Sequence, residues 1–240
     1  MSHLTRSQPG PLRLAMASAK RRLLGTIVGV ATDAPLAALT FDDGPDPEFT
    51  PQLLAVLERH HARGTFFMLG QQAADHPTLL DRVAAGGHTI GNHTFDHVRL
   101  PQTPRGERLR QLWRCRAALR PYGAPIFRPP YGGQSVGSRI DALLLGYAVV
   151  AWSAHVEDWL PQTPEALARR IEDQLRPGAI LLLHDRLHHP RVPAAADRRP
   201  LIAALDLVLG RLGERFRFVT VTELLRSGRP LRTSWFRPAL

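Results

Sequence analysis

The chain has 240 residues and a formal net charge of +10, with 44% hydrophobic and 22% charged residues. This length suits one compact domain, and the near-average composition excludes a disordered or fibrous protein. No apolar run approaches the roughly 18 residues that a spanning helix needs, so we do not expect an integral membrane protein. A single cysteine, Cys115, excludes an intrachain disulfide framework and a cysteine-based zinc site.

The excess of basic residues favours anionic partners, and all of them except Lys20 are arginines. No basic arm interleaved with aromatic residues is present, so we expect no nucleic-acid partner. A basic run at 20–22 precedes apolar residues at 23–30, but this stretch is short, contains glycines and begins late for a signal peptide. We expect a cytoplasmic protein; a peripheral membrane contact through the basic segment 12–24 and the oligomeric state stay open.

From residue 35 onward, short β-like runs alternate with helical segments, which is typical of an α/β fold with parallel, buried strands. Strands are predicted at 36–41, 65–69, 88–91, 126–128, 148–152, 179–183 and 216–219. Helices with a recognisable start are predicted at 52–61 and 166–175. In both cases a threonine suited to capping, Thr50 or Thr163, is followed by a proline that can begin a helix.

Seven consecutive β/α units with right-handed connections curl into a barrel, although an open doubly wound sheet gives the same string of elements. We predict an α/β fold, a (β/α)7 barrel of parallel strands with its active site at the C-terminal strand ends. The domain is assigned to residues 35–228, with an N-terminal extension at 1–34 and a C-terminal tail at 229–240. Residues 186–200, rich in proline and arginine, are predicted to form a long loop beside the site.

Chemically reactive side chains recur where the predicted strands end. They are Asp42 and Asp43 after the first strand, His93 after the third, Arg128 at the end of the fourth, Asp158 and Trp159 after the fifth, and His184 after the sixth. Because active sites of such folds lie at the carboxyl ends of the strands, this recurrence indicates an enzyme.

Two adjacent aspartates and two histidines form the most informative group. His93 and His97 are four residues apart and can bind one cation. Of the adjacent carboxylates Asp42 and Asp43, one tends to be neutralised by a cation while the other stays free for proton transfer. Such a site leaves coordination positions open, so that Zn²⁺ can polarise a substrate oxygen and acidify a bound water. The same ligands also suit non-haem Fe(II) oxygenases.

Five short blocks occur in order along the chain. They are T-F-D-D-G-P at 40–45, H-T-F-D-H at 93–97, R-P-P-Y-G at 128–132, D-W at 158–159 and L-L-H-D at 182–185. In these blocks the chain resembles the polysaccharide deacetylases of carbohydrate esterase family 4. The resemblance covers about residues 39–185, and the alternation of elements extends it to about 225. It implies a distorted barrel of seven or eight strands.

The resemblance also implies a role for each matching residue around the cation. Asp43, His93 and His97 match the ligands of a divalent metal, for which zinc is the expected ion. Asp42 matches the general base that deprotonates the attacking water, and Arg128 matches the partner that orients this base.

On the other side of the site, His184 matches the general acid that protonates the departing amine, and Asp158 matches the carboxylate that holds it. The main-chain N–H of Tyr131 would contribute to the oxyanion hole. The faces of Tyr131 and Trp159 suit stacking against sugar rings, and Leu182 would line a pocket for a methyl group.

The chain departs from the family pattern at His155, where many relatives carry an aspartate three residues before the D-W pair. Because Asp158 is retained, we expect catalysis to survive and favour a tolerated change next to the site; altered hydrogen bonding to Arg128 or an altered substrate preference stays open. His188 and His189, in the loop after the last block, are expected to be solvated.

We therefore predict a metal-dependent hydrolase that removes N-acetyl groups from the amino sugars of a polysaccharide, oligosaccharide or glycan precursor. An esterase acting on O-acetyl groups such as those of xylan, or an amidase of a non-sugar substrate, would use the same residues. A non-catalytic glycan-binding relative is disfavoured, because Asp42 and His184 are both present. An Fe(II) oxygenase would leave those two residues and Arg128 without a task.

Overall fold

The computed structural model describes residues 24–234. The strands are β1 (Thr26–Ala31), β2 (Leu36–Asp42), β3 (Gly64–Met68), β4 (Thr89–Asn92), β5 (Gly123–Phe127), β6 (Ala148–Val149), β7 (Ala154–His155), β8 (Ile180–His184), β9 (Arg217–Phe218) and β10 (Arg229–Thr233). The α-helices are α2 (Phe49–Arg59), α3 (Gly70–Asp75), α4 (Pro77–Ala85), α5 (Arg105–Ala118), α6 (Val136–Leu144), α7 (Pro164–Gln174), α8 (Arg199–Leu212) and α9 (Val221–Leu224). Short 3₁₀-helices lie at η1 (Leu100–Gln102), η2 (Pro130–Gly132) and η3 (Pro193–Ala196).

The main sheet is parallel and curled, with the strand order β6-β5-β4-β3-β2-β8-β7 and with β9 paired to β2. The predicted distorted (β/α)7 barrel is thereby confirmed. Every strand pair of this sheet is parallel, so all of its strands run in the same sense and their carboxyl ends lie at one edge. The register of β2 places Asp42 opposite Phe67 of β3 and opposite His184 of β8. The reactive residues that follow the strands therefore share one edge.

The predicted strands all have counterparts, but the one expected at 148–152 is shorter. β6 ends at Val149, and a second two-residue strand, β7, begins at Ala154. Between them the main-chain amides of residues 150, 151 and 153 donate in turn to the carbonyls of Phe127, Ile27 and Ile180. This segment crosses from the β5 side of the sheet to the β8 side, which is why it does not form one continuous strand.

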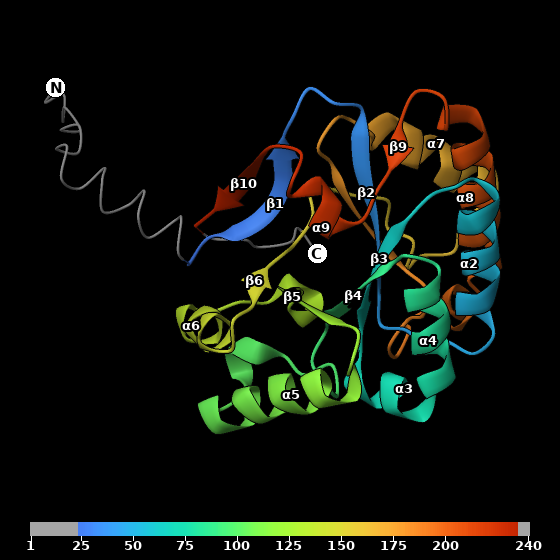
Figure 1. The fold of residues 1–240 in the computed structure, drawn as a ribbon. Helices are drawn as coiled ribbons and strands as arrows, with labels where there is room; N and C mark the ends of the chain where they lie inside the picture. Colours follow the sequence, from blue (N-terminus) through green and yellow to red (C-terminus); the bar gives the residue numbers. More distant parts are fainter. Residues whose placement is uncertain (1–23, 235–240) are drawn as a thin grey trace, which may run out of the picture.

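Helices cover the outer face of the sheet. Figure 1 shows α2, α4 and α8 along its right side, and α5 and α6 at the lower left. The apolar sides of α2, α4, α7 and α8 bury residues such as Leu57, Leu80 and Leu205 against the sheet. A second apolar cluster lies on the other face and contains Phe67 and Leu182. These two layers fix the strand ends that carry the site.

The start of α2 differs from the prediction. The helix begins at Phe49 instead of residue 52, so Thr50 lies inside its first turn. Asp46 caps it from outside, because its carboxylate accepts hydrogen bonds from the amides of Glu48 and Phe49. The hydroxyl of Thr50 instead donates to the buried carboxyl of Asp185 at 2.5 Å. In α7, Thr163 caps the helix as predicted, by accepting from the amide of Ala166.

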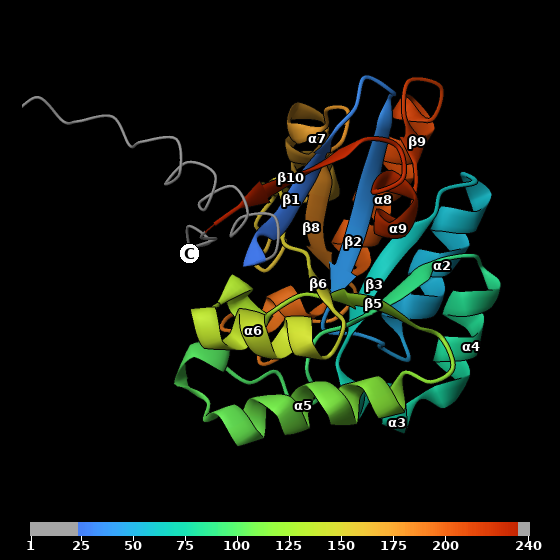
Figure 2. The same ribbon diagram turned by 60° about the vertical axis from the view of Figure 1, so that its left-hand side comes forward.

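A two-stranded antiparallel ribbon joins the two ends of the described chain, β1 and β10. β1 lies in the segment predicted from the sequence as the N-terminal extension, 1–34. β10 lies in the segment predicted as the C-terminal tail, 229–240. β1 also contacts the barrel, since Ile27 accepts from the amide of Ala151 at 2.7 Å and Val30 donates to Gly178 at 2.9 Å. Figure 2 shows the ribbon lying beside β8. The assignment of the domain to residues 35–228 stays a prediction.

Within residues 24–234, no helix is long and apolar enough to cross a membrane. The basic segment at 12–24, for which the sequence leaves a membrane contact open, lies outside the described residues except for Leu24. The predicted loop at 186–200 contains η3 and ends as α8 begins at Arg199.

Candidate metal centre and active site

Asp43, His93 and His97 come together at the carboxyl edge of the sheet. Oδ1 of Asp43 lies 3.3 Å from Nε2 of His93 and 3.1 Å from Nε2 of His97. All three side chains are buried, and one ligand atom from each lies within 4.8 Å of the others. Among the described residues, this is the cluster of histidines and carboxylates with the spacing of a metal site.

The donor atoms fit a cation. Nδ1 of His93 lies 2.7 Å from the carbonyl of Arg128, which accepts its proton, and Nε2 is the ring nitrogen that faces Asp43 and is placed to bind a metal. Oδ1 of Asp43 is buried, and within residues 24–234 it has no hydrogen-bond partner of acceptable geometry. Burial raises the pKa of Asp43, but His97 and His93 outweigh it and hold this pKa well below its usual range. A carboxylate oxygen and two imidazole nitrogens are ligands that a divalent metal accepts.

The backbone around the metal centre is held in a conformation that side-chain-bearing residues rarely adopt. The φ angles of Asp43, Thr94, His97 and Tyr131 are 71°, 69°, 60° and 56°. Such left-handed residues cost free energy and persist where the surroundings fix them, which is typical of functional sites. The site is therefore built on loops of fixed geometry, immediately after β2, β4 and β5.

Asp42 is the second carboxylate of the pair and is held by an internal arginine. The guanidinium of Arg128 donates to Oδ1 of Asp42 and to the hydroxyl of Thr40, both at 2.7 Å, and to the carbonyl of Ala151 at 2.9 Å. Arg128 is fully buried. Burial lowers its pKa, and the negative charge of Asp42 raises it by a smaller amount, so that the pKa stays below its ordinary value. Oδ2 of Asp42 points toward the metal centre, 3.8 Å from Nε2 of His93.

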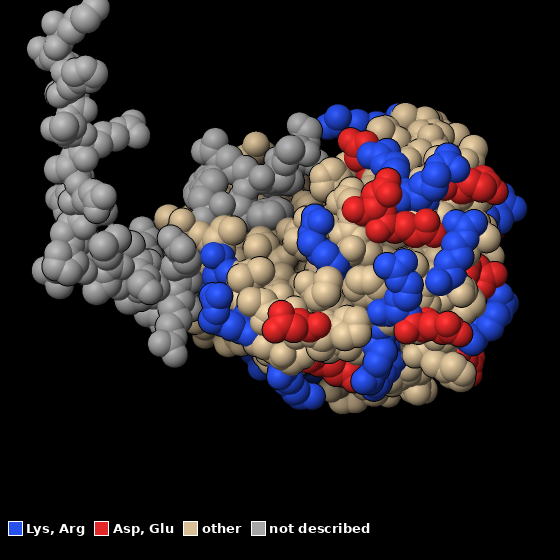
Figure 3. All heavy atoms as spheres, turned by 90° about the horizontal axis from the view of Figure 1, so that it is seen from above, with Lys and Arg blue, Asp and Glu red and all other residues tan. Residues whose placement is uncertain are grey.

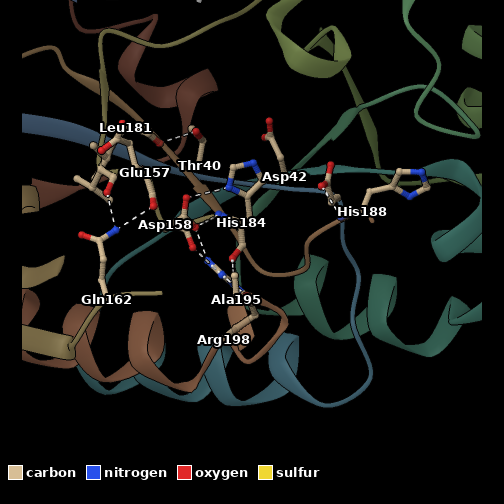
Figure 4. A network of polar contacts seen from close by, with 12 residues as sticks. Thr40, Asp42, Glu157, Asp158, Gln162, Leu181, His184, His188, Ala195 and Arg198 are labelled. Atoms are coloured by element: carbon tan, nitrogen blue, oxygen red, sulfur yellow. Dashed lines mark hydrogen bonds and ion pairs between the residues drawn. The ribbon is translucent and has the colours of Figure 1, made fainter. Parts of the chain in front are cut away.

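His184 ends β8 and is held by Asp158. Oδ1 of Asp158 lies 2.9 Å from Nδ1 of His184, and Oδ2 accepts from the main-chain amide of the same histidine. Figure 4 shows Asp158 between His184 and Arg198. Burial lowers the pKa of His184, but Asp158, with smaller contributions from Asp43 and Asp42, raises it to about 9. The ring is therefore an imidazolium at neutral pH.

Of the three residues predicted to contact substrate, two lie beside the reactive groups and the third lies in an apolar cluster of the core. Tyr131 is half-buried with its ring 4.5 Å from that of His97, and Trp159 is half-buried with its ring edge-on to His184 at 5.9 Å. Both lie beside the reactive groups. Leu182 is buried in the apolar cluster on the inner face of the sheet.

His155 stacks on Trp159, with ring centroids 5.6 Å apart. Its main chain is bonded in both directions by the side chain of Gln174. The bonds of Arg128 go to Asp42, Thr40 and Ala151, and its Nε has no partner among the described residues. The substitution at 155 therefore adds an imidazole face next to the rim tryptophan.

The expectation that His188 is solvated is wrong. Its ring is half-buried at 4.7 Å from the ring of His97, and its main-chain amide donates to Oδ2 of Asp43 at 2.9 Å. The fold brings the 186–200 loop over the metal centre, which buries this side chain. Because every residue except proline has a main-chain N–H, the sequence does not indicate which amide donates to Asp43.

Arg198, from the same loop, is a second residue that sequence reasoning missed. Its buried guanidinium contacts Oδ2 of Asp158 and donates to the carbonyls of Asp158, Ala195 and His184. Burial raises the pKa of Asp158, but His184 and Arg198 outweigh it and lower that pKa. Arg198 lies outside the five blocks, and nothing distinguishes it among the many arginines of the chain.

Comparisons with known proteins agree with this site. The family model for polysaccharide deacetylases matches residues 29–150. A chitooligosaccharide deacetylase of Sinorhizobium fredii is 35% identical over 198 residues, 80% of this chain and 92% of that protein. A peptidoglycan-N-acetylglucosamine deacetylase of Bacillus cereus is 34% identical over 209 residues, 82% of this chain and 91% of that protein.

The fold agrees as well. A family 4 carbohydrate esterase from Streptomyces lividans, solved in complex with acetate, matches with a TM-score of 0.70 and 27% identity, and the match covers 84% of this chain and 98% of that one. Barrel topology, ordered blocks and the Asp-His-His cluster thus point the same way, and the chain belongs to the polysaccharide deacetylase family.

Proposed function

We propose that the protein is a zinc-dependent deacetylase that removes acetyl groups from N-acetylated amino sugars in a glycan. The observation that carries this proposal is the placement of two different proton-transfer groups beside one metal centre. Asp42, paired with Arg128, and His184, paired with Asp158, end neighbouring strands in register with each other. Hydrolysis of an amide needs both a base for water and an acid for the departing amine.

A zinc ion held by Asp43, His93 and His97 would polarise the acetyl carbonyl and increase the acidity of water. Asp42 takes the proton of the attacking water, and Arg128 holds this carboxylate in place by donating a hydrogen bond to its Oδ1. The main-chain N–H of Tyr131 is assigned to the developing oxyanion, a contact worth on the order of 3 kcal/mol for a single donor.

His184 then protonates the nitrogen of the sugar so that the amine leaves. Its pKa of about 9 keeps it protonated at neutral pH, and Asp158 holds its Nδ1 so that Nε2 can carry the transferred proton. Arg198 fixes Asp158 from the other side. The chain thus supplies the acid in its charged form before the reaction begins.

The substrate class follows from the relatives and the rim. The two relatives are named for the deacetylation of chitooligosaccharides and of peptidoglycan N-acetylglucosamine, which supports an N-acetylated amino sugar here. Tyr131 and Trp159 offer half-buried aromatic faces beside the metal centre for sugar rings. We assign the methyl pocket to Leu182.

Mass spectrometry of acetylated glycans incubated with the zinc-loaded protein tests this proposal. We expect the loss of acetyl groups from N-acetylglucosamine oligomers, abolished by Asp42→Asn but retained by Asp96→Asn, an exposed aspartate of the H-T-F-D-H block. Acetate from an O-acetylated xylan but not from the amides would favour the esterase instead. Zinc binding without acetate release from any glycan would contradict the proposal.

A further inference from the structure

Arg99 places a positive charge at the rim of the site. It follows the metal ligand His97 by two residues, and its exposed guanidinium lies over the ring of Tyr131, with Cζ 3.9 Å from the ring centroid. The ring of Tyr131 is in turn 4.5 Å from that of His97. One aromatic ring therefore separates the guanidinium from the metal centre.

The backbone of Arg99 is fixed by hydrogen bonds. Its carbonyl accepts from the main-chain amide of Gln102 and from the hydroxyl of Thr103, both at 2.9 Å, where the short helix η1 begins. This helix packs against the end of η2, because a Cβ on Gly133 would lie 3.5 Å from Cδ of Pro101. The guanidinium is therefore attached to a part of the rim that has a defined shape.

Arg99 forms no ion pair with any carboxylate of residues 24–234, because the acidic side chains around it are engaged by other arginines. In the segment 93–144 and at the site, these pairs are Asp96 with Arg114, Glu107 with Arg110, Asp141 with Arg105 and Arg108, Asp42 with Arg128, Asp46 with Arg186, and Asp158 with Arg198. Asp96 and Glu107 also accept from the side-chain amide of Gln111. The charge of Arg99 is thus left for a ligand.

The surroundings of Arg99 differ from those of many charged residues on this surface. Figure 3 shows a face on which basic and acidic side chains are intermingled. Arg99 instead contacts an aromatic ring, and its guanidinium donates no hydrogen bond to another described residue. A guanidinium on an aromatic face keeps its in-plane N–H groups, which match the two oxygens of a carboxylate. The rim therefore offers a binding group for an anion.

We propose that Arg99 binds a carboxylate carried by the glycan, so that the site selects an acidic glycan. The inference rests on the proposed function, in which the main-chain N–H of Tyr131 meets the oxygen of the acetyl group. Because the ring of the same residue carries the guanidinium, a glycan with its acetyl group at the metal centre brings its neighbouring substituents to Arg99. A carboxylate there displaces no existing partner and is attracted both on approach and when bound.

A matched pair of substrates tests the inference. One is a tetrasaccharide of alternating N-acetylglucosamine and N-acetylmuramic acid with free carboxylates, and the other is its methyl ester, which has nearly the same shape without the charge. In the wild type, kcat/KM for acetate release should be about tenfold higher for the acid, and salt should reduce this preference. Arg99→Gln should remove the preference by slowing the reaction of the acid alone, whereas Arg99→Lys should keep part of it.

The matched control is Arg82→Gln, which should keep the preference of the wild type. Arg82 is exposed in the last turn of α4, which leads to the amino end of β4, whereas the site lies at the carboxyl end of the sheet. The Kd of each glycan, measured by calorimetry on the Asp42→Asn variant with and without Arg99→Gln, supplies a readout that does not depend on turnover.

Equal kcat/KM and equal Kd for the acid and the ester in the presence of Arg99 would overturn the inference, as would a preference that survives Arg99→Gln. An equal loss on both substrates in that variant would overturn it in favour of a purely structural support of Tyr131. Acetate release without a preference would overturn the inference alone. A preference in Kd without acetate release would overturn the proposed function alone, and no binding of either glycan would overturn both.

Discussion

Asp158 divides its two carboxylate oxygens between His184 and Arg198. Oδ1 holds the imidazole nitrogen at 2.9 Å, and Oδ2 receives the guanidinium and the main-chain amide of His184. All of these groups are largely removed from water. The proton donor of the site thus depends on a residue from the 186–200 loop that carries none of the family blocks.

The Arg198→Gln variant should lose stability. Asp158 then keeps a buried charge with one partner fewer, which costs about 3 kcal/mol or more. Urea unfolding measures this loss. The control is Arg199→Gln, because Arg199 pairs with Asp197 at the surface with a side chain that is 67% exposed, and its loss should change the stability far less. Equal losses of unfolding free energy in the two variants would show that the ion pair of Arg198 with Asp158 stabilises the fold no more than a surface pair does.

The Asp158→Asn variant should change the pH dependence of catalysis. In the wild type, activity falls as the pH rises through the pKa of His184, about 9, because the acid loses its proton. Without the Asp158 carboxylate, burial is opposed only by the smaller contributions of Asp43 and Asp42, so this alkaline limb moves down toward the ordinary histidine value of about 6.5. The pH profile of kcat on one oligomer tests this, and an unmoved alkaline limb would assign it to another group.

The same raised pKa makes the stability of the fold depend on pH. Since His184 binds its proton more tightly in the folded state, its contribution is complete below about 6.5 and is lost as the pH rises toward 9. The loss is of order 3 kcal/mol. Unfolding of metal-free protein across this range should show it, and His184→Gln should remove the slope. A slope that persists in that variant would contradict the assignment.

The main-chain amide of His188 should control zinc affinity. His188→Pro removes the donor to Oδ2 of Asp43, whereas His188→Ala keeps it and removes only the ring. Loss of such a support costs about tenfold or more in metal affinity. Competition with a chromogenic chelator measures both variants. Equal affinities in the two variants would show that the amide of His188 does not set the zinc affinity.

Zinc should stabilise the folded protein. A ligand that binds only the folded state adds about 2.7 kcal/mol when its concentration is about 100 times its Kd. We expect chelation to lower the Tm and added zinc to restore it. Asp43→Ser should abolish the zinc-dependent rise, while Asp96→Asn should retain it. A rise of equal size in both variants would place the ion elsewhere.

The sequence predicts most of the barrel because its strands are short apolar runs, separated by helices of regular periodicity. β7 is missed because two residues, Ala154 and His155, are too few to produce a pattern. The β1–β10 ribbon is missed because its partners, Thr26 and Thr233 among them, lie at opposite ends of the chain. Such pairing depends on tertiary structure and not on local preference.

The metal centre is predictable for a physical reason. Its ligands, Asp43, His93 and His97, occupy contiguous blocks at strand ends, where a parallel sheet gathers them. The residues that hold the site together are harder to predict. Arg198 acts through burial and His188 through its backbone, and neither property is visible in a string of side chains.

X-ray absorption at the zinc edge identifies the atoms that bind the ion. With one equivalent of zinc bound, we expect two imidazole nitrogens and at least one oxygen at about 2.0–2.1 Å, and the loss of one imidazole in His97→Gln. A shell without imidazole scattering, or one unchanged in that variant, would show that Asp43, His93 and His97 do not share the ion.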